Sequence, residues 1–198
     1  MRHCLRGAAS LLRAPRSIRE LPNGANLREA QARYSYADIA KALRRVGSNV
    51  KEDLVELYRR MVFNCMIGNR DDHLCNHGFL LEPGTGRYRL SPAFDLALHP
   101  GNPSLHPIAI GRQGRQPTLE NVLSIAPTFG LKVEQARQIC DQVADSVQSW
   151  RTVMIRHGVK STDLEWVEGL LPKGFGHAHH EASLSAPVSI SSPSWALR

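Results

Sequence analysis

Residues 69–76 read Asn-Arg-Asp-Asp-His-Leu-Cys-Asn, and residues 91–95 read Ser-Pro-Ala-Phe-Asp. The first stretch is a dense group of polar side chains directly behind an apolar segment with helical periodicity. Between the two stretches, apolar residues flank the turn-forming sequence Glu-Pro-Gly-Thr-Gly. We therefore expect a helix, a polar loop and a short β-hairpin that returns Asp95 to the side of Asn76.

Asp71, Asn76 and Asp95 have the order and spacing of three residues that protein kinases use for phosphoryl transfer. In kinases the first aspartate orients the acceptor hydroxyl, while the asparagine and the second aspartate hold magnesium ions beside the ATP phosphates. The reaction is accelerated mainly by positioning and by cations, so oxygen ligands are the residue types that it needs. The Asp-to-Asn spacing by itself is a weak signal.

Three other interpretations of the polar loop stay open at this point. Aspartate is common in turns, so Asp71 and Asp72 also fit an ordinary loop. A metal-dependent nuclease could use the same crowded ligands, which are Asp71, Asp72, His73, Asn76 and His77. Zinc binding by His73, Cys75 and His77 would need a distant fourth ligand, because their alternating spacing does not close a tetrahedral site.

The rest of the chain has mainly helical patterns. Ser35 and Asp38 form a capping box that predicts a helix over 36–46. Asn49 with Glu52 predicts the start of the next helix, whose apolar face runs toward the polar loop and contains Asn64, a candidate for orienting that loop. Further predicted helices lie within 118–129, from Ala136 toward Gly158, and after Thr162; residues 99–117 are expected to form an irregular loop, and Trp150 and Trp166 to be core residues.

Composition indicates one domain at 1–172 followed by a disordered tail at 173–198, where the cluster His177, His179 and His180 has no expected role. The chain has 198 residues and a formal net charge of +7. This charge favours an anionic nucleotide or an acidic partner, but it equally fits a solvated basic surface, and we expect no direct nucleic-acid contact. The four cysteines lack paired spacing, which indicates reduced thiols and a cytoplasmic location. No apolar run is long enough to span a membrane.

The arginine-rich start of the chain has two interpretations. Its lack of acidic residues before Glu20 is similar to an organelle transit peptide. Alternatively, residues 5–12 form an arginine-rich helix within the fold, and this is the interpretation that we prefer. A polar connector is expected to follow at 23–33.

The polar loop and its flanks resemble the C-terminal half of HipA-type serine/threonine kinase toxins. The similarity is carried by residues 60–80 (Arg-Met-Val-Phe-Asn-Cys-Met-Ile-Gly-Asn-Arg-Asp-Asp-His-Leu-Cys-Asn-His-Gly-Phe-Leu), by 89–96 (Arg-Leu-Ser-Pro-Ala-Phe-Asp-Leu) and by 35–45 (Ser-Tyr-Ala-Asp-Ile-Ala-Lys-Ala-Leu-Arg-Arg). It extends over roughly 1–172. The resemblance also makes the start of the chain part of the kinase core, which is why we prefer a helix there.

The resemblance implies a mainly helical, kinase-like C-lobe in which one small β-hairpin carries the catalytic and metal-binding loops. It implies that Asp71 is the catalytic aspartate, that His73 helps to hold the loop, and that Asn76 and Asp95 bind Mg²⁺ and thereby ATP. The implied partners are a protein substrate, with aminoacyl-tRNA synthetases among the targets of the family, and a DNA-binding antitoxin.

The family's ATP-binding N-terminal lobe has no counterpart here, since neither a phosphate-binding glycine motif nor its strand lysine is visible. We therefore expect a truncated kinase, or a split one with a separate N-lobe chain. The alternative is a catalytically inactive remnant that acts only as a binding module. Arg70, beside the catalytic aspartate, departs from the small polar residue that we expect in the family, and is predicted either to pair with Asp71 or to anchor substrate phosphate.

Overall fold

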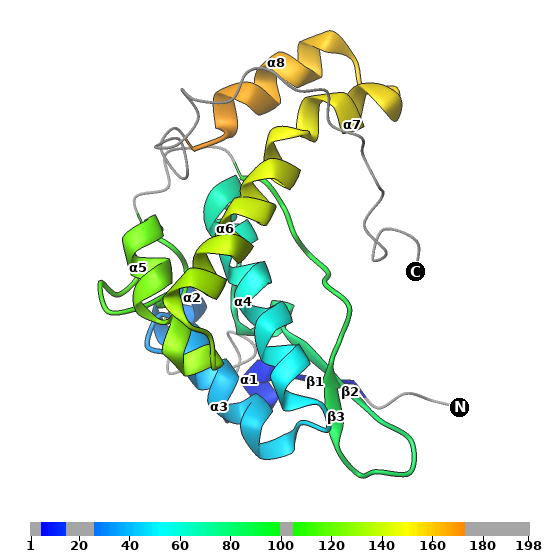
Figure 1. Cartoon of the computed structure of the whole chain (residues 1–198). Coiled ribbons are helices and arrows are strands. Elements are labelled where there is room, and N and C mark those ends of the chain that lie inside the picture. Colours follow the sequence, from blue (N-terminus) through cyan, green and yellow to red (C-terminus); the bar gives the residue numbers. More distant parts are fainter. Residues whose placement is uncertain (1–4, 15–25, 100–104, 173–198) are drawn as a thin grey trace.

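The computed structural model describes residues 5–14, 26–99 and 105–172. The long helix α4 (Val50–Ile67) runs through the centre of the molecule, and α3 (Tyr36–Val46) and α6 (Val133–Gln148) pack against it (Figure 1). The remaining helices are α1 (Ala8–Leu11), α2 (Leu27–Gln31), α5 (Leu119–Ser124), α7 (Trp150–Arg156) and α8 (Ser161–Leu170), with short 3-10 turns at η2 (Leu74–Asn76) and η3 (Ala126–Phe129).

The core forms where apolar faces of these helices meet. α4 buries Leu57, Tyr58 and Met61 completely, because its apolar residues recur at helical spacing on the side that α3 and α6 cover. The ring of Tyr58 packs edge-on against Phe129, and its hydroxyl donates a hydrogen bond to the Val122 carbonyl at 3.1 Å. These contacts bind η3 and α5 to the central helix.

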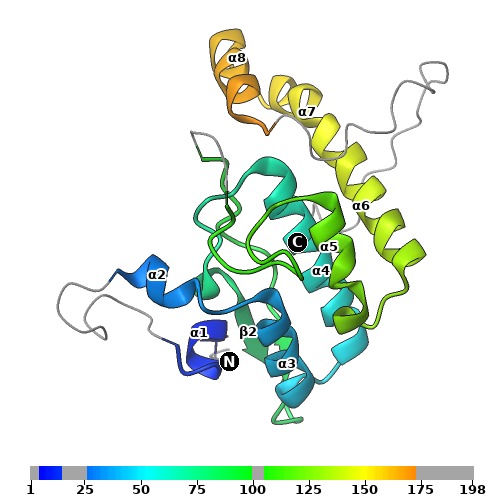
Figure 2. The same ribbon diagram turned by 90° about the vertical axis from the view of Figure 1, so that its left-hand side faces the viewer.

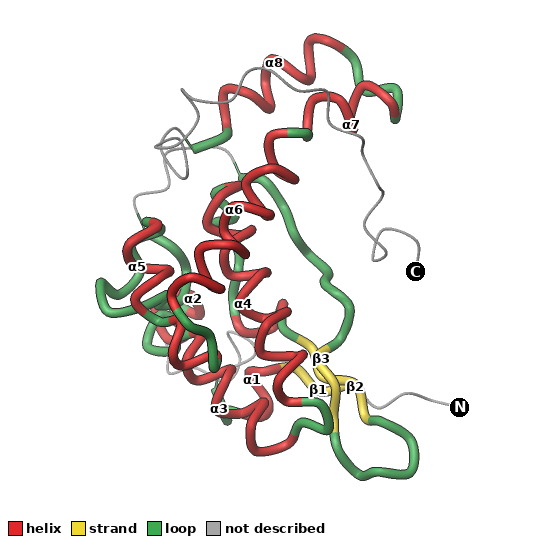
Figure 3. The backbone as a smooth tube through the Cα atoms, in the orientation of Figure 1, coloured by secondary structure: helices red, strands yellow, loops and turns green. Residues whose placement is uncertain are grey.

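The described strands form one small antiparallel sheet at an end of the helical body, with the order β1 (Leu5–Gly7), β2 (Gly78–Leu81) and β3 (Tyr88–Leu90) (Figure 3). Phe79 pairs with Leu90, and both side chains are buried on the helix-facing side. Asp53, buried near the start of α4, accepts hydrogen bonds from the Arg89 side chain and from the Leu90 backbone. The hairpin is thereby attached to the central helix.

The structure confirms a mainly helical fold with a hairpin and also corrects several details. The expected single hairpin is part of a three-stranded sheet, because residues 5–7 form β1 on its edge. The helix expected over 5–12 is therefore present only as α1, since strand pairing with a distant segment overrides local helical preference at 5–7. The expected connector contains α2, and the long helix toward Gly158 is divided at Ser149 into α6 and α7.

The capping box predicted at Ser35 is present, with its side chain accepting from the Asp38 backbone and the Asp38 side chain from the Ser35 backbone. At Asn49 the side chain instead donates to Glu52 and makes no cap bond to the backbone. The prediction that Trp150 and Trp166 are core residues is wrong. Trp150 is half-buried and Trp166 is 60% exposed, since α7 and α8 project from the end of α6 away from the sheet (Figure 2). The expected tail, including its histidine cluster, lies outside the described residues. No helix in the described parts is both long and apolar enough to cross a membrane.

Candidate active site

The polar loop, residues 69–77, begins where α4 ends. Gly68 closes the helix with a left-handed backbone (φ 69°), a conformation that glycine adopts without steric cost. The next residue, Asn69, donates its backbone N–H to the Asn64 carbonyl at 2.9 Å. The direction of the loop is therefore fixed by the end of the central helix.

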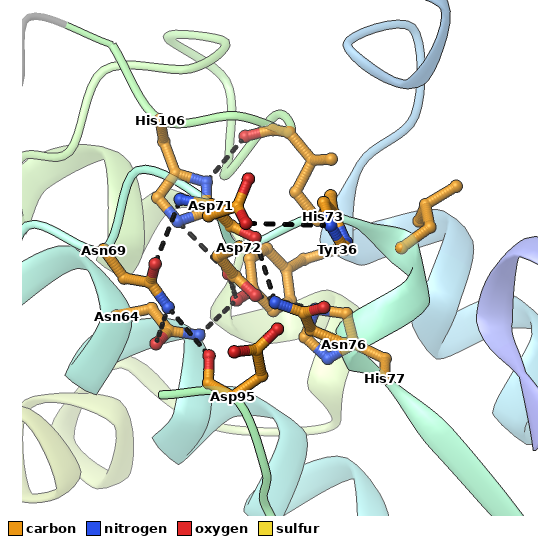
Figure 4. A network of polar contacts seen from close by, with 12 residues as sticks. Tyr36, Asn64, Asn69, Asp71, Asp72, His73, Asn76, His77, Asp95 and His106 are labelled. Atoms are coloured by element: carbon orange, nitrogen blue, oxygen red, sulfur yellow. Dashed lines mark hydrogen bonds and ion pairs between the residues drawn. The ribbon is translucent and has the colours of Figure 1, made fainter. Parts of the chain in front are cut away.

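Two buried asparagines connect this loop to its surroundings (Figure 4). The Asn69 amide donates to the Asn64 side-chain oxygen at 3.2 Å and to the Asp95 carbonyl at 3.4 Å, while its own oxygen accepts from the Asp71 N–H at 3.0 Å. Asn64 donates in turn to the Tyr36 hydroxyl at 3.3 Å. The expectation that Asn64 helps to orient the loop is confirmed, and Asn69 is the residue that joins its start to the segment containing Asp95.

Asp72 is the anchor of the loop. Its carboxylate is 1% exposed and accepts a short hydrogen bond from Tyr36. The Nε2 atoms of His77 and His106 lie 3.1 and 3.2 Å from its two oxygens, within ion-pair distance but without the alignment of a good hydrogen bond. The other nitrogen of His106 lies 3.0 Å from the Ile108 carbonyl. Asp72 thus connects α3, the end of the loop and the distant segment around 106.

The electrostatics of this cluster favour an ionised Asp72. Burial by itself would raise the pKa of the carboxyl group, but electrostatic attraction to His77 and His106 outweighs it and holds the pKa well below the usual range. Burial and the nearby charge of Asp72 raise the pKa of the Tyr36 hydroxyl, which therefore stays a donor. The same two causes raise the pKa of the Cys65 thiol.

Of the predicted site residues on the loop, Asp71 and His73 are partly exposed, whereas Asn76 is buried. Asp71 has a side chain 36% exposed, and its carboxylate lies 3.9 Å from Nε2 of His73. The Asn76 amide donates to the Asp71 carbonyl at 2.9 Å, so the loop closes on itself. From α2, the buried Gln31 accepts a hydrogen bond from the Leu74 N–H at 3.0 Å and supports the inner side of the loop.

The segment 91–99 carries Asp95 and is held more loosely. Arg60 of α4 donates to the Ser91 carbonyl at 2.6 Å, and Asn69 donates to the Asp95 carbonyl. Asp95 itself has a left-handed backbone (φ 56°), which is uncommon outside glycine. Its exposed carboxylate makes no hydrogen bond or ion pair with any residue that the structure describes. Phe94 and Leu96 beside it are 40% and 41% exposed.

One network thus contains all four residues predicted from the sequence, Asp71, His73, Asn76 and Asp95, with Asn69 joining the loop to the Asp95 segment. The roles of Asp72, His106, Tyr36 and Gln31 were missed. For Asp72, its position next to the predicted catalytic aspartate was an available signal. For His106 the sequence offered no signal, because this residue lies in a region that was expected to be an irregular loop.

The ligand sets of the zinc and nuclease interpretations are only partly accessible. His77 and Asp72 are buried against each other, so neither side chain faces a position open to solvent. Within the described residues, no group of three or more histidine, cysteine or acidic side chains is arranged to hold a metal ion.

Comparison with known proteins identifies the relatives of this chain. The sequence profile of the HipA-like C-terminal domain matches residues 9–151. No curated protein sequence matches the chain. Among solved structures, the chain is similar to one from Shewanella oneidensis MR-1, the toxin–antitoxin system HipA, HipB and operator DNA complex, with a TM-score of 0.53 and 13% identity. The match covers 85% of this chain and 41% of that one, so this chain spans less than half of the length of its relative.

At 13% identity the structural match supports the fold alone, and the fold agrees with the sequence profile. The profile covers the loop, the hairpin and all four predicted site residues. Because the matched residues make up most of the chain, the protein belongs to the HipA-like C-terminal domain family.

Proposed function

We propose that this chain is the C-terminal kinase lobe of a HipA-type toxin, and that it supplies half of a site that transfers phosphate from ATP to a serine or threonine of a protein. The observation that carries the proposal is the single hydrogen-bond network that brings Asp71, Asn76 and Asp95 together across the hairpin. Family membership supports it.

In this proposal Asp71 accepts or orients the proton of the acceptor hydroxyl, since its carboxylate is accessible at the outer side of the loop. His73 contacts Asp71 and helps to hold it. The side-chain amide of Asn76 donates a hydrogen bond to the Asp71 carbonyl, and its side-chain oxygen would bind a ligand. The loop therefore presents oxygen atoms without having to rearrange.

The donor set fits Mg²⁺, which prefers oxygen ligands and usually keeps several waters. Asn76 and Asp95 would hold it, since both are oxygen donors and the Asp95 carboxylate has no other partner in the described chain. The left-handed backbone of Asp95 is the kind of strain that functional sites retain. A bound Mg²⁺ would neutralise charge on the ATP phosphates.

The partners follow from the same family argument. The Shewanella structure contains HipB and operator DNA with HipA. By analogy, this chain would be restrained by a DNA-binding antitoxin and would act with an N-terminal lobe, either in the same polypeptide or as a separate chain. The exposed Phe94 and Leu96 also suit the competing proposal of a binding module without catalysis.

The test is transfer of label from γ-labelled ATP to bacterial proteins. It should be run with the chain alone and with a HipA N-terminal lobe supplied as a second polypeptide. Transfer should need Mg²⁺ and should fall at least about 100-fold in Asp71→Asn, consistent with loss of a general base, but not in Asp163→Asn, an exposed control on α8. If no transfer occurs in either arrangement while the added lobe still binds, the chain is a binding module.

A further inference from the structure

A half-open cavity of about 470 Å³ is lined by residues of β1, of α1 and its end, and of the end of α3. Helices α1 and α3 are in contact and lie side by side (Figure 2). The cavity is lined by the guanidinium-bearing Arg6, Arg13 and Arg45 together with the apolar Leu11, Leu12 and Val46. This size falls in the range typical of small-molecule sites, roughly 300–1,000 Å³. None of these residues belongs to the site described above.

The three arginines have no acidic partner in the part of the chain that the structure describes. Within the described residues, none of them forms an ion pair with a carboxylate. Arg45 donates one hydrogen bond to the Leu11 carbonyl at 3.0 Å, and the Arg6 guanidinium lies 5.8 Å from the centre of the Tyr88 ring. Because a guanidinium has five N–H donors, these contacts fix two of the side chains and still leave donors for an anion.

The backbone at Arg13 gives an independent indication that its side chain matters. α1 ends in a turn in which Ala14 N–H bonds to the Ala9 carbonyl at 2.8 Å and Arg13 takes a left-handed conformation (φ 55°). Glycine is the usual residue at this position, because any Cβ there is strained. An arginine that breaks this local rule, on the wall of a cavity with two more arginines, indicates a binding role.

We propose that this cavity binds a small organic phosphate, with the phosphate held by the three guanidinium groups and the organic part packed against Leu11, Leu12 and Val46. Planar guanidinium groups bind the oxygens of phosphate and carboxylate in pairs, and the charge of three such groups favours a doubly charged phosphate over a singly charged carboxylate. The apolar wall favours a phosphate that carries an organic group over inorganic phosphate. The proposal does not depend on the kinase proposal.

The direct test is an NMR titration of the ¹⁵N-labelled chain with phenyl phosphate, inorganic phosphate and benzoate in separate experiments. Saturable shifts are expected at 6–13 and 45–46, with phenyl phosphate binding most tightly and benzoate most weakly. The proposal is overturned if these amide signals do not shift with phenyl phosphate at millimolar concentration, or if benzoate binds as tightly as phenyl phosphate.

Variants distinguish a built site from general attraction to a basic protein. Arg13→Gly removes a guanidinium and also relieves the backbone, so it should keep or raise the thermal midpoint while weakening phenyl phosphate about tenfold or more. Arg6→Gln should weaken binding without requiring any backbone change. Arg156→Gln, an exposed control on α7 with the same loss of charge, should leave the affinity unchanged. Unchanged affinity in Arg13→Gly, or an equal loss in Arg156→Gln, would refute the proposal.

Discussion

The polar loop at 69–77 and the segment at 91–99 both carry predicted site residues, yet they are held in different ways. The loop is anchored through the buried Asp72, which contacts Tyr36, His77 and His106 on three separate parts of the chain. The segment is held at its start by Arg60 and at Asp95 by one long hydrogen bond from Asn69, and its side chains from Pro92 to Leu96 are exposed.

This difference suggests a division of roles. A residue that orients an acceptor hydroxyl must be held within a fraction of an ångström, which requires a rigid loop. A metal-binding aspartate can complete its position when the metal and ATP bind. The adjacent residues Asp71 and Asp72 show the same division, because the first is accessible and the second is the anchor.

Removing the anchor should have the largest effect. Asp72→Ala leaves two imidazoles and the Tyr36 hydroxyl buried without their partner, and should lower the free energy of unfolding by about 3–5 kcal/mol. Urea denaturation measures this. Asp163→Ala, an exposed aspartate on α8, should change it by less than about 0.5 kcal/mol. A loss below about 1 kcal/mol for Asp72→Ala would mean that the loop is held by something else.

The anchor also predicts how stability depends on pH. The pKa of Asp72 is lower in the folded chain than its ordinary value of about 3.9, so the folded state favours the ionised form. The contribution of Asp72 to the free energy of unfolding is therefore fully present above about pH 4. It is lost as the pH falls further, toward the pKa of Asp72 in the folded chain. Comparing wild type with Asp72→Asn in urea from pH 7 to pH 3 should show a difference that shrinks only below about pH 4. A difference that shrinks between pH 7 and pH 5 would show that the carboxylate is not the titrating group.

Loosening the second region should have an intermediate effect. Arg60→Gln removes the charged donor to the Ser91 carbonyl and should cost about 1.5–3 kcal/mol, with faster hydrogen exchange at 91–99 than at 69–77. The neighbouring Arg59→Gln is the control, because Arg59 bonds only to the Gln142 side chain among described residues. Equal acceleration of exchange in both regions would show that they are one rigid unit.

The smallest effect on stability is expected at Asp95, the proposed metal ligand. Asp95→Asn removes an exposed carboxylate that has no partner in the described chain, so the free energy of unfolding should change by less than about 0.5 kcal/mol. The same substitution should remove any stabilisation by Mg²⁺, measured as the shift of the thermal midpoint with added Mg-ATP. If that shift survives in the variant, Asp95 is not a ligand.

The sequence predicted local features well, since capping residues, helical periodicity and turn residues determine them. The helix behind Ser35 and the hairpin at 78–90 both follow from short-range patterns. What it did not predict depends on contacts between distant segments: the pairing of residues 5–7 with β2, the exposure of Trp166 and the approach of His106 to Asp72. A lone histidine in an irregular loop has no pattern that identifies its partner.

The most direct test of the central claim, that Asn76 and Asp95 form one metal site across the hairpin, is paramagnetic broadening by Mn²⁺ used in place of Mg²⁺. Spectra of the ¹⁵N-labelled chain with ATP should lose the backbone signals around Asn76 and Asp95 at substoichiometric Mn²⁺, and Asp95→Asn should retain them. Broadening centred elsewhere, or broadening around Asn76 that persists unchanged in Asp95→Asn, would contradict the claim.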